Sequence, residues 1–104
     1  MAEEAVLLSI DDAVATIRLN RPEAFNSVNA ALAEGLIQAL DQCAEDEAVR
    51  CIVLTGSGKS FCAGQDLKEV TNPDKSQVPE FRDLLEQRYD PIVKRLRRIE
   101  KPIV

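Results

Sequence analysis

The sequence predicts an α/β protein in which a β-hairpin, a helix, a third strand and further helices follow one another. Three observations predict it. Two short runs rich in Val, Ile and Leu stand at 6–10 and 13–19, apolar residues recur at helical spacing over 29–45, and another apolar run at 51–54 opens into a glycine-rich loop. The chain has 104 residues, 45% of them hydrophobic and 30% charged. This composition is typical of a single folded domain and argues against disorder.

The first expected element is a β-hairpin over residues 5–20. Its second run places Ala15, Ile17 and Leu19 alternately with other positions, as in a strand with one buried face. The pair Asp11-Asp12 separates the two runs and suits a tight turn.

An amphipathic helix is expected next, over about 29–45. Asn29 is a favourable N-cap because its side chain can accept from backbone N–H groups of the first turn. The apolar residues that follow recur every three or four positions, at Leu32, Leu36, Ile37, Leu40 and Ala44. An acidic stretch at 45–47 ends this helix and leads to a buried strand over 50–55.

The remaining elements are a glycine- and serine-rich loop, a short helical stretch at 67–70 and a long helical segment after residue 80. Pro91 falls inside that segment and is expected to kink or split it, because proline lacks the N–H that a helix needs. Lys101-Pro102 stops the helix, and Ile103-Val104 looks like the opening of a further strand.

Charge and composition exclude several classes of partner. The net charge of −5 disfavours nonspecific binding to nucleic acid. No apolar run approaches the roughly 18 residues that span a bilayer, so no membrane partner is expected. The three cysteines are odd in number and follow no metal spacing, so we expect reduced thiols, a cytoplasmic location and no metal. Five basic residues gather late in the chain and form either a solvated helix face, which is favoured, or a polyanion site: Lys94, Arg95, Arg97, Arg98 and Lys101.

The chain contains no histidine. This excludes Ser-His and Cys-His nucleophilic pairs and any zinc site built with histidine. Cys62, in the glycine loop, therefore has no histidine to activate it. Proton transfer would have to use carboxylates, lysine, tyrosine or water held by the backbone.

The glycine loop admits a phosphate-binding interpretation, which the residues disfavour. Gly56-Ser57-Gly58-Lys59-Ser60 follows a strand, but the full phosphate-loop motif needs glycine at position 53, where this chain has Val53. We expect Gly58-Lys59 to form a surface turn instead.

The second interpretation of the loop is an oxyanion site. Backbone N–H groups just past Gly64, at the head of a helix, can bind a developing enolate or thioester oxyanion. The alternative is that Gly64 only permits a tight strand-to-helix turn, and spacing alone favours that alternative.

Four segments of the chain form a specific pattern in their order and spacing. They are Leu19-Asn20-Arg21-Pro22-Glu23 with Asn26, Ile52-Val53-Leu54-Thr55-Gly56, Phe61-Cys62-Ala63-Gly64-Gln65-Asp66-Leu67, and Lys101-Pro102-Ile103-Val104. On these residues the chain resembles the N-terminal part of the crotonase, or enoyl-CoA hydratase/isomerase, family. The variant at 62–67, with Tyr89-Asp90-Pro91-Ile92-Val93-Lys94-Arg95-Leu96 downstream, looks most like the phenylacetyl-CoA ring-epoxide isomerases.

The resemblance implies a crotonase-like spiral of ββα turns, with residues 1–104 as its N-terminal part, ending before the second oxyanion segment. It implies an acyl-CoA isomerase or hydratase that stabilises a thioester enolate, including 2-(1,2-epoxy-1,2-dihydrophenyl)acetyl-CoA isomerase. Coenzyme A would enter as part of the substrate, with no separate cofactor, and the intact protein would form a homotrimer or homohexamer. We expect these 104 residues alone to be inactive, because one oxyanion donor without a base gives little catalysis. A noncatalytic CoA-binding or assembly fragment and, more weakly, a nucleotide-binding phosphate loop remain open.

The resemblance also implies roles for particular residues. The backbone N–H of Gln65 would be one of two oxyanion donors, past the turn at Gly64. The carbonyl of Ala63 would accept from the adenine amino group. Asp66 and Leu67 would line the channel for coenzyme A.

The same resemblance places three more residues near the coenzyme. Lys68 would meet a phosphate of coenzyme A, and Ala24 and Phe25 would flank its adenosine or pantetheine. Some family members carry a basic residue where this chain has Phe25, which argues against phosphate binding from that side. Arg21 is expected to hold its loop structurally. The acidic residues are expected to be solvated or capping charges: Asp66, Glu69, Glu80, Asp83 and Glu86.

Overall fold

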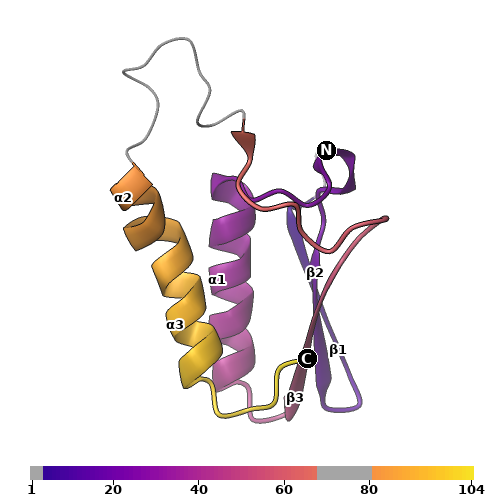
Figure 1. Ribbon diagram of the computed structural model, residues 1–104. Helices are drawn as coiled ribbons and strands as arrows, with labels where there is room; N and C mark the ends of the chain where they lie inside the picture. Colours follow the sequence, from indigo (N-terminus) through magenta and orange to yellow (C-terminus); the bar gives the residue numbers. More distant parts are fainter. Residues whose placement is uncertain (1–3, 68–80) are drawn as a thin grey trace.

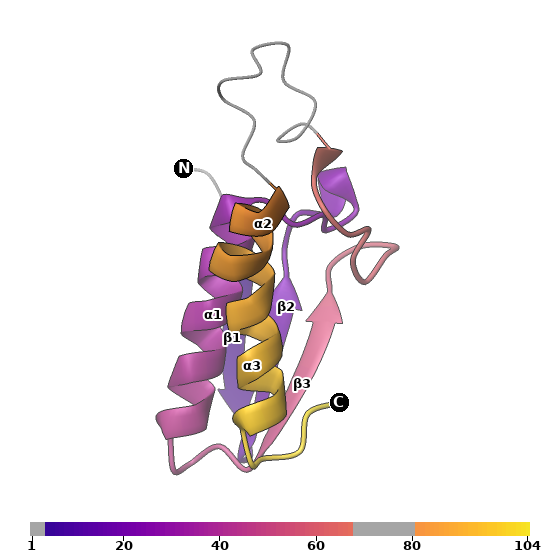
Figure 2. The same cartoon turned by 60° about the vertical axis from the view of Figure 1, so that its left-hand side comes forward.

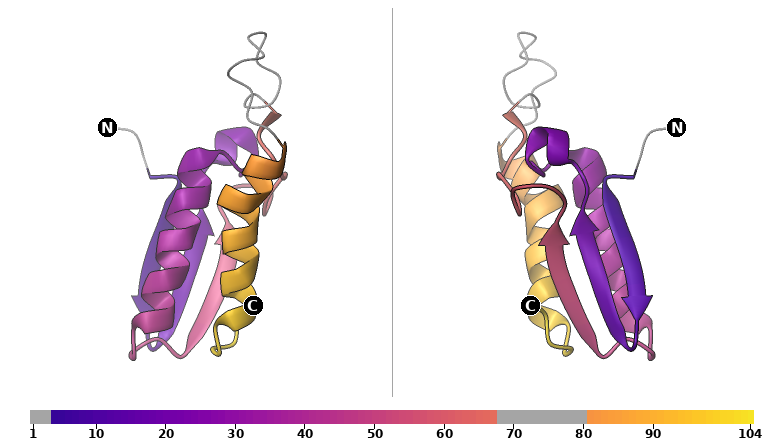
Figure 3. Two further views of the ribbon diagram at one scale, coloured as in Figure 1. Left: turned by 90° about the vertical axis from the view of Figure 1, so that its left-hand side faces the viewer. Right: turned by 90° about the vertical axis from the view of Figure 1, so that its right-hand side faces the viewer.

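The structure is a computed structural model that describes residues 4–67 and 81–104. A three-stranded sheet in the order β1-β2-β3 forms one layer. Helices α1 and α3 lie side by side and cover the same face of the sheet (Figures 1 and 3). The expected α/β class is therefore confirmed for the part of the chain that the structure describes.

Strands β1 (Val6–Asp11) and β2 (Val14–Leu19) form the predicted hairpin. They are antiparallel, with Asp11 opposite Val14, so the turn consists of Asp12 and Ala13. Both turn residues have positive φ angles, 51° and 69°, which match the two-residue turn that best fits the twist of a hairpin. The turn lies one residue later than the sequence suggested.

Helix α1 (Ala30–Glu45) connects β2 to the parallel strand β3 (Cys51–Gly56). The Oδ1 of Asn29 accepts from the N–H of Leu32 at 2.9 Å, which confirms the predicted cap. Because β2 and β3 are parallel, both strands end at the same edge of the sheet, beside the start of α1 (Figure 2). We call this edge, with the loops after β2 and β3, the loop end.

The helical segment after residue 80 is split, as Pro91 predicted. It comprises α2 (Phe81–Leu84), the π-helical turn η4 (Leu85–Tyr89) and α3 (Asp90–Arg98). Asp90 donates its N–H to the carbonyl of Leu85, five residues back, and Pro91 follows at the start of α3. The missing proline donor thus falls at a helix start, where it is tolerated.

The last two residues extend the sheet beside β3. Ile103 forms a parallel bridge with Ile52, and the N–H of Val104 donates to the carbonyl of Ile52 at 2.9 Å. This confirms the predicted strand-like character of Ile103-Val104.

The core lies between the sheet and α1. Its largest fully buried apolar side chains come from β2, α1, the residues just before β3, and β3 itself: Ile17, Leu32, Leu40, Val49 and Ile52. Gly35 of α1 lets the helix approach β1, since a Cβ there would lie 3.0 Å from the Val6 side chain. Among the described helices, none is long and apolar enough to cross a membrane.

Candidate functional site

The loops that follow β2 and β3 run side by side at the loop end. The N–H of Ala63 donates to the carbonyl of Phe25 at 3.0 Å. The N–H of Val28 donates to the carbonyl of Gly64 at 2.6 Å, and the N–H of Asp66 donates to the carbonyl of Val28 at 2.8 Å. Segments 36 to 38 residues apart in the sequence therefore form one short, two-stranded backbone surface.

These hydrogen bonds determine where the Gln65 N–H points. Gln65 forms an isolated parallel bridge with Val28, and the two bonds of that bridge use groups of Gly64 and Asp66. In a trans peptide the C=O and the following N–H point in opposite directions. Because the Gly64 carbonyl is bonded to Val28, the Gln65 N–H points away from Val28.

Gly64 makes this arrangement possible and leaves room beside it. Its φ angle is +97°, a left-handed conformation that favours glycine. Among the residues that the structure describes, none has an atom within 4 Å of a Cβ placed on Gly64, so these residues leave the space next to the Gln65 peptide open. Gly64 therefore forms the tight turn that the sequence suggested. The same turn places the Gln65 N–H beside space that the other described residues do not fill.

Asn26 joins the two loops from within. Its side chain is fully buried, and its φ angle of 58° is one that asparagine tolerates better than most residues. Its Oδ1 accepts from the N–H of Arg21, and its Nδ2 donates to the carbonyls of Ser57 and Ser60, each at 2.8 Å. Gly56 packs against the same group, since a Cβ there would lie 2.7 Å from Nδ2 of Asn26.

Arg21 holds the second link between the loops. Its Nη2 forms an ion pair with Oδ2 of Asp66 at 3.0 Å, and its Nη1 donates to the carbonyl of Ser27 at 2.6 Å. Arg21 is thus structural, as expected. The expectation that Asp66 is a solvated or capping charge is wrong: the residue is only 9% exposed, because Arg21 compensates its charge in the interior.

The other residues expected in the site lie around the same two loops. Ala24 ends the 3-10 turn η1 (Pro22–Ala24), and Phe25 follows it with 57% of its surface exposed. Leu67 is 69% exposed. The structure thus brings together the two segments to which the resemblance assigns the coenzyme, while the individual binding roles stay predictions.

Some sequence predictions lie outside the described residues. These are the position of Lys68, the acidic residues Glu69 and Glu80, and the helical stretch at 67–70 beyond its first residue. Asp83 and Glu86 are exposed, as expected for solvated charges.

Gly58-Lys59 forms the expected surface turn. Both residues are exposed, and Gly58 has a φ angle of +81°. Residues 60–66 contain no helix that could present its N-terminus to a phosphate held by this turn. The geometry therefore also argues against a phosphate loop.

Tyr89 contacts the site, although the sequence indicated it only as part of a matching segment and gave it no role. Tyr89 is the last residue of η4, and its hydroxyl donates to Oε1 of Gln65. The Nε2 of the same Gln65 side chain donates to the carbonyl of Asp66 at 3.2 Å. Tyr89 is the chain's only tyrosine, but no local pattern relates it to a loop 24 residues earlier.

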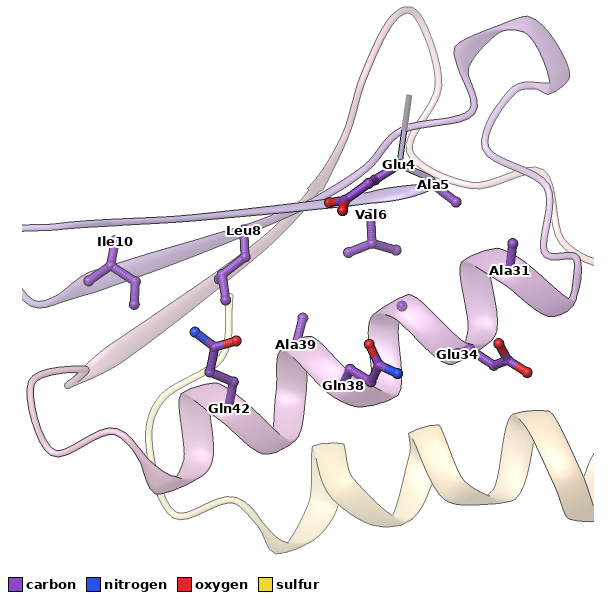
Figure 4. Close-up of a pocket in the computed structure, with 11 residues that line it drawn as sticks. Glu4, Ala5, Val6, Leu8, Ile10, Ala31, Glu34, Gln38, Ala39 and Gln42 are labelled. Atoms are coloured by element: carbon purple, nitrogen blue, oxygen red, sulfur yellow. The ribbon is translucent and has the colours of Figure 1, made fainter. Parts of the chain in front are cut away.

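Two hollows lie away from this loop pair, and neither is lined by a residue that the sequence assigned to the site. A groove of about 620 Å³ lies between β1 and α1. Figure 4 shows Val6 and Leu8 of β1 pointing toward α1, from which Ala39 and Gln42 point back toward the strand. Among the described residues that line it, the charged ones are Glu4 and Glu34, which would repel the phosphates of an acyl-CoA, so the groove does not compete with the loop end as the site.

The second hollow, of about 610 Å³, lies where α1 and α3 end, at the opposite end of the molecule from the loops. Arg95 forms two hydrogen bonds with Asp41, at 2.6 and 3.2 Å, and Lys101 donates to the carbonyls of Cys43 and Asp46 at 2.6 and 2.7 Å. Lys94, Arg97 and Arg98 are exposed. The basic cluster is thus only partly a solvated face, because two members connect the helices.

Comparisons with known proteins agree with this geometry. The sequence pattern of the family described as Enoyl-CoA hydratase/isomerase matches residues 9–104. The chain is 38% identical over 101 residues to 1,2-epoxyphenylacetyl-CoA isomerase of Escherichia coli (strain K12), covering 97% of this chain and 38% of that protein. It is 41% identical over 91 residues to 4-chlorobenzoyl coenzyme A dehalogenase-2 of Arthrobacter sp, covering 88% of this chain and 33% of that protein.

A solved structure, an enoyl-CoA hydratase from Mycobacterium smegmatis, matches with a TM-score of 0.82 at 38% identity, over 97% of this chain and 38% of that one. The chain therefore spans well under half the length of the relatives it matches. The family pattern covers nearly all of the chain, and it includes both loops of the candidate site. From its sequence and its fold alike, this chain belongs to the enoyl-CoA hydratase/isomerase (crotonase) family.

Proposed function

We propose that the loop end binds the thioester of an acyl-CoA and that the backbone N–H of Gln65 donates to the thioester oxygen. One observation carries the proposal: the Gln65 N–H points away from Val28, beside the open space at Gly64. A fixed backbone donor is worth most where negative charge develops, because it needs no reorganisation during the reaction. In the intact protein this donor would stabilise an enolate during isomerisation or hydration of the acyl group.

The exposed apolar side chains beside the loops support a site for coenzyme A. Phe25 and Leu67 offer apolar surface next to the backbone groups of residues 63–66. Pantetheine and adenine are largely apolar in their contacts and need a few well-placed backbone groups for orientation. Coenzyme A would act as part of the substrate, and the proposal requires no separate cofactor. We also propose a homotrimer or homohexamer in the cytoplasm for the intact protein.

The finer proposal for the reaction is isomerisation of ring-epoxidised phenylacetyl-CoA. It rests on the relative from Escherichia coli, which is named for that substrate. A relative of similar identity is named as a dehalogenase of a different aromatic acyl-CoA. The shared feature of both printed names is an aromatic acyl-CoA, so the proposal for the substrate class is stronger than the proposal for the reaction.

A noncatalytic CoA-binding fragment is the second candidate for this 104-residue chain. The ion pair between Asp66 and Arg21 favours it, because the acidic group of the loop is already used to hold the fold. Turnover of crotonyl-CoA and of ring-epoxidised phenylacetyl-CoA by the chain separates the two candidates. Turnover of either thioester well above the uncatalysed rate would exclude the noncatalytic fragment.

Binding itself is tested by titrating the ¹⁵N-labelled chain with phenylacetyl-CoA, coenzyme A, and ATP with magnesium. We expect both coenzyme A compounds to shift the amide signals of residues 62–67, with the Gln65 signal responding mainly to the thioester. Shifts caused by ATP with magnesium but not by coenzyme A would contradict the proposal and favour the phosphate loop.

A matched pair of glycine substitutions sharpens this test. Gly64→Ala adds a methyl group to the open space beside Gln65. Gly58→Ala adds one to the nearby surface turn, 3.0 Å from the Cβ of Pro22, which must shift slightly to make room. Both residues have positive φ angles, so both variants carry a similar backbone strain of about 1–2 kcal/mol. We expect at least a tenfold loss of phenylacetyl-CoA affinity from Gly64→Ala and less than a twofold loss from Gly58→Ala. Equal losses would show that strain, and not occupancy of the open space, explains the effect.

A further inference from the structure

The backbone of Gln65 is held by the neighbouring loop that contains Val28. The bonds to Val28 fix one edge of the residue at the Gly64 carbonyl and the Asp66 N–H. Both bonds lie along one line, the bridge between the loops. A ligand that pulls on the opposite N–H acts across this edge, so a contact from another direction would limit rocking of the peptide.

The side chain of Gln65 supplies the second anchor. Its carboxamide is oriented by two bonds: Nε2 donates to the carbonyl of Asp66 at 3.2 Å, and Oε1 accepts from the hydroxyl of Tyr89. The amide nitrogen therefore acts as a donor and the amide oxygen as an acceptor, as the chemistry of a carboxamide requires. The bond to Tyr89 is the one that leaves the loop and reaches another layer of the molecule.

Tyr89 is itself held on a rigid element. It ends the π-helical turn η4, which contacts α1, and its half-buried ring packs against the core. Asp90 closes the wide turn by donating to the Leu85 carbonyl, and Pro91 begins α3 directly afterwards. Single π-helical turns of this kind are frequent at functional sites, because the extra residue redirects a side chain.

We propose that Tyr89 is a positioning residue for the oxyanion donor: its hydroxyl, through the Gln65 side chain, holds the Gln65 peptide against the pull of the thioester oxygen. This inference rests on the proposed function of the Gln65 N–H and adds the residue that makes that donor rigid. Preorganised donors act through such supporting contacts, since a donor that moves with the ligand stabilises charge poorly. Tyr89 does not touch the thioester in this account.

The test compares wild type with Tyr89→Phe, which removes only the hydroxyl. We expect the Phe variant to bind phenylacetyl-CoA about threefold to tenfold more weakly, the loss expected for one hydrogen bond, while its affinity for coenzyme A changes less than twofold. The infrared stretch of a ¹³C-labelled thioester carbonyl should shift less on binding to the variant. The ¹⁵N relaxation of the Gln65 amide in the free chain should show larger motion.

Controls separate positioning from a general structural effect. Glu86→Gln changes an exposed side chain in the same π-helical turn and should leave every readout unchanged. Gln65→Ala keeps the backbone N–H but removes the link, so Tyr89→Phe should have no additional effect in that background. Additive losses in the double variant would overturn the inference.

The outcomes for the two proposals differ. If wild type binds neither compound, the proposed function fails, and this inference fails with it. If wild type binds phenylacetyl-CoA with the Gln65 response and Tyr89→Phe behaves identically, only the role of Tyr89 is overturned. A parallel loss for coenzyme A and its thioester would likewise contradict positioning, because it would show a general loosening of the site.

Discussion

The two ends of this molecule are both held by polar side chains bonded to backbone groups, yet they differ in burial and in what they leave exposed. At the loop end Asn26 is fully buried and Asp66 is 9% exposed. At the opposite end, which we call the helix-terminus end, the side chains of Arg95 and Asp41 are 32% and 49% exposed. Water can therefore replace the contact between Arg95 and Asp41 far more easily than the contacts of Asn26 and Asp66.

The difference teaches how a binding surface is built from backbone. At the helix-terminus end Lys101 donates to the last carbonyls of α1, a favourable place for a cation. At the loop end Asn26 and Arg21 satisfy groups that lie between two loops, and the bonds of Val28 between the same loops turn the Gln65 N–H away from Val28. The bonds of Lys101 complete the end of helix α1, whereas the bonds of Asn26 and Arg21 determine the shape of the candidate site.

Removing the Asn26 side chain should cause the largest effect. Asn26→Ala leaves the N–H of Arg21 and the carbonyls of Ser57 and Ser60 without their buried partner. We expect a loss of about 4 kcal/mol in the free energy of unfolding, measured by urea denaturation. Asn26→Asp keeps the acceptor but replaces the donor, so it should also destabilise the chain. A loss below about 1 kcal/mol for Asn26→Ala would show that water replaces the side chain at the loop end as well.

The two ion pairs offer the most direct comparison of the ends. Asp66→Ala removes one partner of a largely buried pair and should cost about 3 kcal/mol of stability, because Arg21 is left uncompensated. Asp41→Ala removes one partner of the exposed pair with Arg95 and should have a much smaller effect that weakens further at high salt. Denaturation of both variants at low and high salt measures this. Equal effects would remove the proposed difference between the ends.

Lys101→Met tests the helix-terminus end alone. The methionine keeps an apolar stem of similar length but cannot donate to the carbonyls of Cys43 and Asp46. We expect a loss of about 1 kcal/mol in the free energy of unfolding, because the charged donor at the end of α1 is removed. Lys101→Arg should recover part of it. The amide shifts of the loop end should not change, and a response there would contradict the independence of the two ends.

Cys43, at the helix-terminus end, should make the stability depend on pH in alkaline solution, with the smallest effect of the series. Burial raises the pKa of the Cys43 thiol above its ordinary value of 9.0; Lys101 opposes this and Asp46 adds to it. The unfolded chain therefore loses this proton first, so the stability that Cys43 contributes is present below pH 9 and declines as the pH rises above it.

Urea denaturation between neutral pH and about pH 10 measures this decline. Cys43→Ala should make the dependence shallower, because it removes the buried thiol. Identical slopes for wild type and Cys43→Ala would contradict the prediction.

Local sequence patterns determined most of the elements. Alternation in β2 and helical spacing in α1 follow from which side chains must leave water, and Asn29 and Pro91 act on the backbone within a turn of their own positions. These causes extend over a few residues, so they can be recognised without the fold. The residues that match the family pattern likewise located the loop of the candidate site.

Only the tertiary structure decided which residues of that loop are buried and what holds them. Asp66 was expected among the solvated charges, but Arg21, 45 residues away, compensates it inside the protein. Neither Val28 nor Tyr89 carries a local signal for its bond to Gln65 or its neighbours. By itself the sequence determined the elements and the glycine turn, because those depend on local geometry and hydrophobicity. The direction of the Gln65 N–H depends on hydrogen bonds between segments that only folding brings together.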